Sequence, residues 1–159
     1  MKGILYGIGV GPGDPELLTL KAVNILWSAD IIAASERGSG HAALGIAERY
    51  IRGKALLLCP AQTAADAIAK QLGAGKSVAF ITPGDPSVYS AFTQIRRRVA
   101  ELGYETATVP GITHFCAEAA NAGEALCDKN EPLLVLPSAL PAELKGRRNF
   151  TVVREPYAN

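Results

Sequence analysis

Cysteine is scarce in this sequence, and the few cysteines present form no pattern. Cys59, Cys116 and Cys127 are the three cysteines among 159 residues, and no Cys-x-x-Cys pair occurs. An odd number of widely spaced cysteines argues against a disulfide framework and against a cysteine-based zinc site. We therefore expect a protein of the reducing cytoplasm that holds no metal.

Excess charge and long apolar runs are lacking as well. Lys and Arg total 16 against 15 Asp and Glu, which gives a formal net charge of +1 and not the basic excess typical of a nucleic-acid-binding protein. No apolar run approaches the roughly 18 residues that a membrane-spanning helix needs. Prolines and glycines break the apolar N-terminal stretch without the cleavage site of a signal peptide. We expect neither nucleic acid nor membrane as a partner.

Short apolar runs alternate with helix-period segments along most of the chain. This alternation predicts parallel strand pairing and a layered α/β fold. The predicted strands are Ile4–Val10, Ile31–Ala34, Ala55–Leu58, Val78–Thr82 and Thr106–Val109, and the predicted helices are Glu16–Ser28, His41–Tyr50, Ala61–Leu72, Ser87–Leu102 and Thr113–Ala122. Trp27, Phe92, Cys116 and Cys127 are expected to pack in the core.

The pattern of residues changes at Pro110-Gly111, a pair that is typical of a hinge. Beyond it, Leu133–Leu136 and Thr151–Val153 have the composition of strands, and a polar, proline-bearing stretch separates them. We predict an N-terminal α/β lobe over residues 1–110 with a parallel sheet and layered helices. Residues 111–159 are expected to begin a second α/β lobe that this chain leaves incomplete.

Three loops that mix glycine and proline follow three of the predicted strands. They are Val10-Gly11-Pro12-Gly13-Asp14-Pro15, Pro83-Gly84-Asp85-Pro86 and Val109-Pro110-Gly111-Ile112-Thr113. Any one of them could be an ordinary turn, since these residues are common turn formers. In a parallel sheet, however, all three lie at one edge, where open α/β proteins bind ligands. Together they predict a pocket lined by backbone amides and carbonyls.

The first loop does not match a dinucleotide-binding motif. Gly7 and Gly9 would need a third glycine at position 12, and Pro12 stands there instead. Proline lacks the N–H group that a pyrophosphate requires. The predicted pocket therefore suits an uncharged or zwitterionic ligand with an adenine and an amino-acid end.

The three loops, taken in order, resemble those of the tetrapyrrole methylases, which use S-adenosylmethionine. The resemblance extends over residues 5–23, 80–90, 109–115 and 128–137. Within that family it is strongest to the branch that methylates C20 of precorrin-2 or cobalt-factor II in cobalamin synthesis. It implies a cofactor held between two lobes, a tetrapyrrole substrate and a homodimer of the full-length enzyme.

The resemblance also implies a set of cofactor-binding residues, carried over motif by motif. They are Pro12, Pro83, Gly84, Asp85, Val88, Thr113 and His114. Some family members have an acidic proton acceptor after the second strand, but Ser35 occupies that position here. The resemblance therefore assigns no catalytic base to any residue of this chain. The nearby groups that could accept a proton are Glu36, His41 and His114. Residues of these types are more often ordinary surface or packed residues than catalysts.

A polycarboxylate substrate calls for basic side chains near the same edge. Arg37, Lys54 and the run Arg96–Arg98 are the candidates. Helical spacing predicts that the run faces solvent, which leaves Arg37 as the better substrate-binding residue. The alternatives are methylation of another corrin position, a different substrate such as ribosomal RNA, or a non-catalytic truncated lobe.

Overall fold

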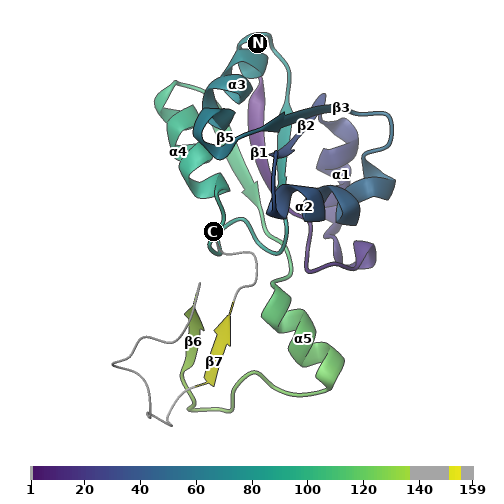
Figure 1. The fold of residues 1–159 in the computed structure, drawn as a ribbon, viewed down its shortest axis with the longest axis vertical. Helices are drawn as coiled ribbons and strands as arrows, with labels where there is room; N and C mark the ends of the chain where they lie inside the picture. Colours follow the sequence, from purple (N-terminus) through teal and green to yellow (C-terminus); the bar gives the residue numbers. More distant parts are fainter. Residues whose placement is uncertain (1, 137–150, 155–159) are drawn as a thin grey trace.

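The computed structural model describes residues 2–136 and 151–154. Its main sheet is parallel throughout, with the strand order β3-β2-β4-β1-β5, and a parallel pair β6-β7 lies apart from it (Figure 1). The strands are β1 (Ile4–Gly9), β2 (Ile31–Ser35), β3 (Ala55–Cys59), β4 (Val78–Thr82), β5 (Glu105–Val109), β6 (Leu133–Leu136) and β7 (Thr151–Arg154). The α-helices are α1 (Leu20–Ser28), α2 (Ser39–Ala47), α3 (Ala61–Gly73), α4 (Phe92–Glu101) and α5 (His114–Ala122). The predicted α/β class is confirmed.

Helices cover both faces of the main sheet, with α1 and α2 on one face and α3 and α4 on the other (Figure 1). Successive residues of β2 alternate between the two apolar clusters: Ile32 and Ala34 join the first, and Ile31 and Ala33 join the second. Burial on both faces explains why the central strands are apolar runs and not alternating ones. Burying one such isoleucine contributes about 1.5–3 kcal/mol.

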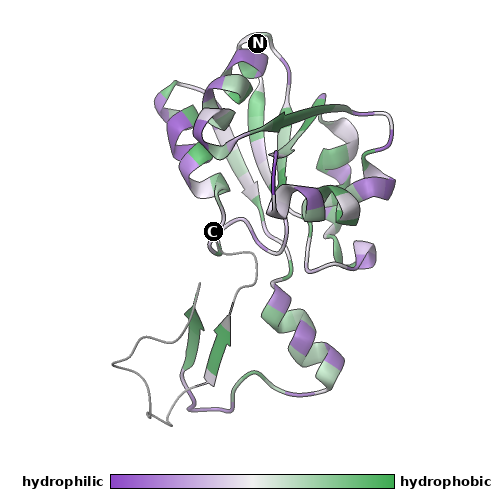
Figure 2. Cartoon of the chain, viewed as in Figure 1, coloured by the Kyte–Doolittle hydropathy of each residue, from purple (hydrophilic) through white to green (hydrophobic). Residues whose placement is uncertain are grey.

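The second region consists of α5 and the strands β6 and β7. In Figure 2 these two strands are among the most apolar segments, and Leu133 pairs with Thr151 in parallel register. The predicted strands at these two places are confirmed. The polar stretch expected between them, Ser138–Asn149, lies outside the described residues. None of the helices in the described ranges is long and apolar enough to cross a membrane.

The predicted helix over Glu16–Ser28 is wrong at its start. A single 3-10 turn, η1 (Pro15–Leu17), comes first, and α1 begins only at Leu20. Two local caps explain the break. Asp14 accepts a hydrogen bond from the N–H of Glu16 (2.8 Å), and the Thr19 hydroxyl accepts one from the N–H of Ala22 (3.1 Å).

The predicted helix over Ser87–Leu102 also begins too early, since α4 starts at Phe92. Tyr89 adopts a φ of 45°, which is incompatible with a right-handed helix. The hydroxyl of Ser90 then accepts a hydrogen bond from the Phe92 N–H (3.2 Å). A separate 3-10 turn, η2 (Glu48–Tyr50), likewise replaces the end of the predicted helix His41–Tyr50.

Of the four residues expected in the core, only Phe92 is buried. Trp27 is 59% exposed and leans against the Tyr50 ring, with ring centroids 6.5 Å apart. Cys116 and Cys127 are exposed, whereas Cys59 is buried at the end of β3. The core prediction was therefore wrong for Trp27, Cys116 and Cys127, because these positions lie at the outer surface of α1, on α5 and in the segment after α5.

Candidate functional site

The loops after β1, β4 and β5 meet through their glycines. A Cβ atom placed on Gly111 would lie 2.0 Å from the carbonyl oxygen of Gly84, and one on Gly9 would lie 2.6 Å from that same oxygen. Real Cβ atoms cannot approach so closely, so only glycine permits this contact. The prediction that the three loops gather at one edge of the sheet is confirmed.

Backbone hydrogen bonds continue the pairing of the first two loops past the ends of their strands. The N–H of Gly84 donates to the carbonyl oxygen of Gly11 (2.8 Å), and the N–H of Gly11 donates back to that of Gly84 (3.3 Å). The N–H of Val10 donates to the carbonyl oxygen of Thr82 (3.0 Å). These bonds fix the first loop against the second.

Asp85 braces the second loop against the third. Its Oδ2 accepts a hydrogen bond from the N–H of Gly111 (2.9 Å), and its Oδ1 accepts one from the N–H of Ser87 (2.7 Å). The Ser87 hydroxyl also donates to Oδ1. Protein donors thus occupy both carboxylate oxygens. The sequence Asp-Pro-Ser is itself a turn signal that could have indicated this local role.

Thr113 carries an unsatisfied hydroxyl at the start of α5. Its Oγ1 is buried and has no hydrogen-bond partner among the described residues, and it does not cap the helix. A buried hydroxyl without a partner is costly, so such a group is suited to bind a polar atom of a ligand. The hydroxyl lies at the N-cap of α5, two residues after Gly111.

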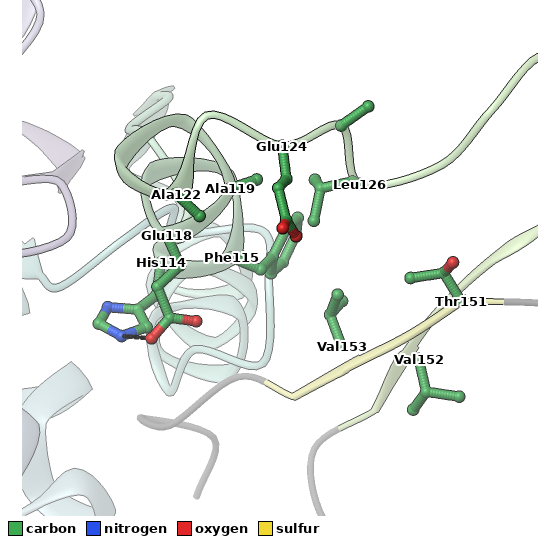
Figure 3. A pocket seen from close by; sticks show the side chains of 11 residues that line it. His114, Phe115, Glu118, Ala119, Ala122, Glu124, Leu126, Thr151, Val152 and Val153 are labelled. Carbon is green, nitrogen blue, oxygen red and sulfur yellow. Dashed lines mark ion pairs between the residues drawn. The ribbon is translucent and has the colours of Figure 1, made fainter.

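The remaining predicted cofactor residues are not brought together in one cavity. His114 lines a cavity of about 680 Å³ between α5, the segment 124–126 and β7. Figure 3 shows His114 at one end of it beside Glu118, with 3.0 Å between His114 Nε2 and Glu118 Oε1. Pro83 and Val88 line a recess of only about 10 Å³, and Pro12 lines neither this recess nor the cavity beside His114.

Arg37 lies in a third cavity, of about 530 Å³, at the same edge of the sheet. The segments that begin α2 and α3 form its walls, and neither helix has a side-chain hydrogen bond at its N-cap. The N-terminal ends of the two helix dipoles and the Arg37 guanidinium bring positive charge to this edge, and the Glu36 carboxylate, which lines the same cavity, brings one negative charge. Ser35 lines both this cavity and the neighbouring recess.

The other basic candidates serve different purposes or face solvent. Lys54 donates from Nζ to the carbonyl oxygens of Ala29 (2.8 Å) and Trp27, and so caps the C-terminal end of α1. Arg96, Arg97 and Arg98 are exposed on the outer side of α4. Arg37 thus remains the basic side chain that lines a cavity at the edge where the loops meet.

Cys59 is the last residue of β3, near the Arg37 cavity, and its thiol is buried. Burial raises the pKa of its thiol, and the neighbouring Glu36 carboxylate raises it further. The thiolate, not the thiol, is the nucleophile. Cys59 therefore packs as a small apolar side chain.

Comparison with known proteins identifies relatives of this chain. The sequence model of the tetrapyrrole (corrin/porphyrin) methylases matches residues 4–155. The cobalamin biosynthesis protein CobIJ of Mycobacterium tuberculosis is 35% identical over 92% of this chain and 33% of its own length. The precorrin-2 C(20)-methyltransferase of a Sinorhizobium species is 33% identical, covering 92% of this chain and 69% of that protein. The chain thus spans a third of one relative and about two thirds of the other.

Solved structures of the same kind share the fold. The cobalt precorrin-4 methyltransferase CbiF aligns with a TM-score of 0.70 and 26% identity over 83% of this chain and 56% of that chain. The uroporphyrin-III C-methyltransferase of Thermus thermophilus, solved with S-adenosylhomocysteine, aligns with a TM-score of 0.64 and 24% identity over 84% of this chain and 55% of that one. The family match over nearly the whole chain, the relatives and the shared fold agree: the chain belongs to the tetrapyrrole (corrin/porphyrin) methylase family.

Proposed function

We propose that this chain binds S-adenosylmethionine at the junction of its three glycine loops and takes part in methylating a tetrapyrrole in cobalamin biosynthesis, at C20 of precorrin-2 or cobalt-factor II. The meeting of Gly9, Gly84 and Gly111 at the carboxyl edge of the sheet carries the proposal. The C20 assignment is supported by the names of relatives, among them the Sinorhizobium enzyme and a probable cobalt-precorrin-2 C(20)-methyltransferase of Methanocaldococcus jannaschii, which is 35% identical.

The chain's own contribution to such a reaction is to position the two reactants and keep water away. When bound, S-adenosylmethionine supplies an electrophilic methyl group. The backbone of Gly84 and Gly111 and the Thr113 hydroxyl would hold the cofactor, and the brace from Asp85 keeps those groups in place. Methyl transfer would form a carbon–carbon bond, break the carbon–sulfur bond and release S-adenosylhomocysteine, and the proton lost from the methylated carbon would pass to a nearby base such as the Glu36 carboxylate, which lines the Arg37 cavity. Ser35 cannot accept that proton as a carboxylate would.

The direct test is methyl transfer in solution. The purified chain is incubated with precorrin-2 and S-adenosylmethionine that carries a ¹³C-labelled methyl group, and the product is examined by NMR. We expect the label at C20. Label at another carbon would assign the chain to another branch of the family. Saturable binding of S-adenosylhomocysteine without any transfer would contradict the enzymatic role and identify a binding lobe.

Arg37 is proposed to hold a substrate carboxylate. We expect Arg37→Ala to weaken tetrapyrrole binding about tenfold or more, because a charge-assisted hydrogen bond contributes about 1.5–3 kcal/mol. S-adenosylhomocysteine binding should be unchanged. Both affinities can be measured by titration, with Arg97→Ala on the exposed side of α4 as the matched control. Equal losses of both ligands in Arg37→Ala would show that Arg37 supports the fold and not the substrate.

A further inference from the structure

Tyr89 is the one non-glycine residue with a positive φ in the described ranges 2–136 and 151–154. Its φ of 45° places the backbone in the left-handed region, which costs free energy for any residue with a side chain. Glycine or asparagine would be the ordinary choice at such a position. A tyrosine held there suggests that its side chain is needed where this backbone geometry directs it.

The surrounding contacts hold the Tyr89 turn from both ends. On one side, Asp85 fixes Ser87 through the two hydrogen bonds described above. On the other side, the Ser90 hydroxyl donates to Thr82 Oγ1 (3.2 Å) and accepts from the N–H of Phe92 (3.2 Å). With both ends fixed, the turn cannot relax toward a helix, so the unfavourable φ persists.

The Tyr89 side chain crosses to the second region of the chain. Its hydroxyl donates a hydrogen bond to the carbonyl oxygen of Val135 (2.9 Å), 46 residues away. Val135 lies inside β6 and pairs with Val153 of β7. The side chain is 40% exposed, as expected for one that reaches out from the first lobe. This bond joins the segment after β4 directly to the β6-β7 pair.

We infer that Tyr89 is a positioning residue: its hydroxyl ties the β6-β7 pair to the loop that carries Pro83, Gly84 and Asp85, and so sets the second region against the cofactor site. The role in cofactor binding rests on the proposed function. The tie itself does not, since it is a contact within the protein. If the strained turn at Tyr89 only packed against neighbouring residues, the Tyr89 hydroxyl would not be needed.

The test uses Tyr89→Phe, which keeps the ring and removes only the hydroxyl. Hydrogen exchange of peptides that cover residues 133–136 should become at least about fivefold faster, while exchange in β1 and β4 stays unchanged. The dissociation constant for S-adenosylhomocysteine should rise about fivefold to tenfold. Tyr104→Phe is the matched control, because Tyr104 lies before β5, at the opposite end of the main sheet from the loops, and should change neither measurement.

Unchanged exchange at residues 133–136 in Tyr89→Phe would overturn the tie. Faster exchange with an unchanged dissociation constant would overturn the positioning role. If the unaltered chain bound no S-adenosylhomocysteine, the proposed function would fail, and the exchange measurement would still decide whether the tie exists. Tyr89→Gly adds a second check: it relieves the backbone but removes the hydroxyl, so exchange at 133–136 should rise there too.

Discussion

Replacing Gly111 with alanine is expected to remove measurable S-adenosylhomocysteine binding and to lower the free energy of unfolding by about 2 kcal/mol, as overpacking typically does. The new Cβ would lie 2.0 Å from the Gly84 carbonyl oxygen and 2.9 Å from the backbone of Gly9. All of these neighbours are backbone atoms, so no side chain can swing aside. The three loops would have to separate, and the site they form would be lost.

Gly45→Ala provides the matched control for Gly111→Ala. Gly45 lies inside α2, and a Cβ there meets nothing within 4 Å. Alanine in a helix interior should raise the free energy of unfolding by about 0.5–1 kcal/mol and leave ligand binding unchanged. Calorimetry for binding and urea denaturation for stability measure both effects. A Gly111→Ala protein with normal stability and affinity would show that the loops do not meet as described.

Asp85→Asn is expected to weaken S-adenosylhomocysteine binding about tenfold and to destabilise the protein by about 1–3 kcal/mol even without ligand. The amide that replaces one carboxylate oxygen is a donor, and it would face either the N–H of Gly111 or the donors of Ser87. One of these hydrogen bonds must therefore be lost. The loop after β5 would lose its brace to the loop after β4.

The stability of the ligand-free protein shows whether Asp85 holds two loops together or only contacts the ligand. If Asp85 acted only on the cofactor, Asp85→Asn would lower affinity and leave the urea denaturation midpoint unchanged. That result would contradict the role assigned to it here. Asp66→Asn, on the exposed side of α3, removes a carboxylate of the same kind and should alter neither property.

The main sheet and its loop edge could be predicted because they depend on patterns that the sequence shows directly. The bounds of Val78–Thr82 and Leu133–Leu136 were predicted as the structure has them, since each is a continuous apolar run. Parallel pairing places the three loops at one edge, and their direct contact follows from the adjacency of β4, β1 and β5 in the sheet. The identity of the ligand, by contrast, came from resemblance and not from the pattern of residues.

Helix starts and exposed apolar residues could not be predicted in the same way. The starts of α1 and α4 depend on hydrogen bonds that the hydroxyls of Thr19 and Ser90 accept from backbone N–H groups, and these bonds compete with helical periodicity. Trp27 has the spacing of a core residue but lies at the outer surface of α1. The contact between Tyr89 and Val135 joins distant parts of the chain, so no local sequence pattern indicates it.

Calorimetric titration of the purified chain with S-adenosylhomocysteine tests the central claim most directly, namely that the three glycine loops form a cofactor site. We expect saturable one-to-one binding. We also expect about tenfold weaker binding in Thr113→Val, which removes at nearly constant volume the buried hydroxyl that has no partner among residues 2–136 and 151–154. A chain shown to be folded by circular dichroism that gives no saturable heat would contradict the account. So would a Thr113→Val protein that binds as tightly as the original.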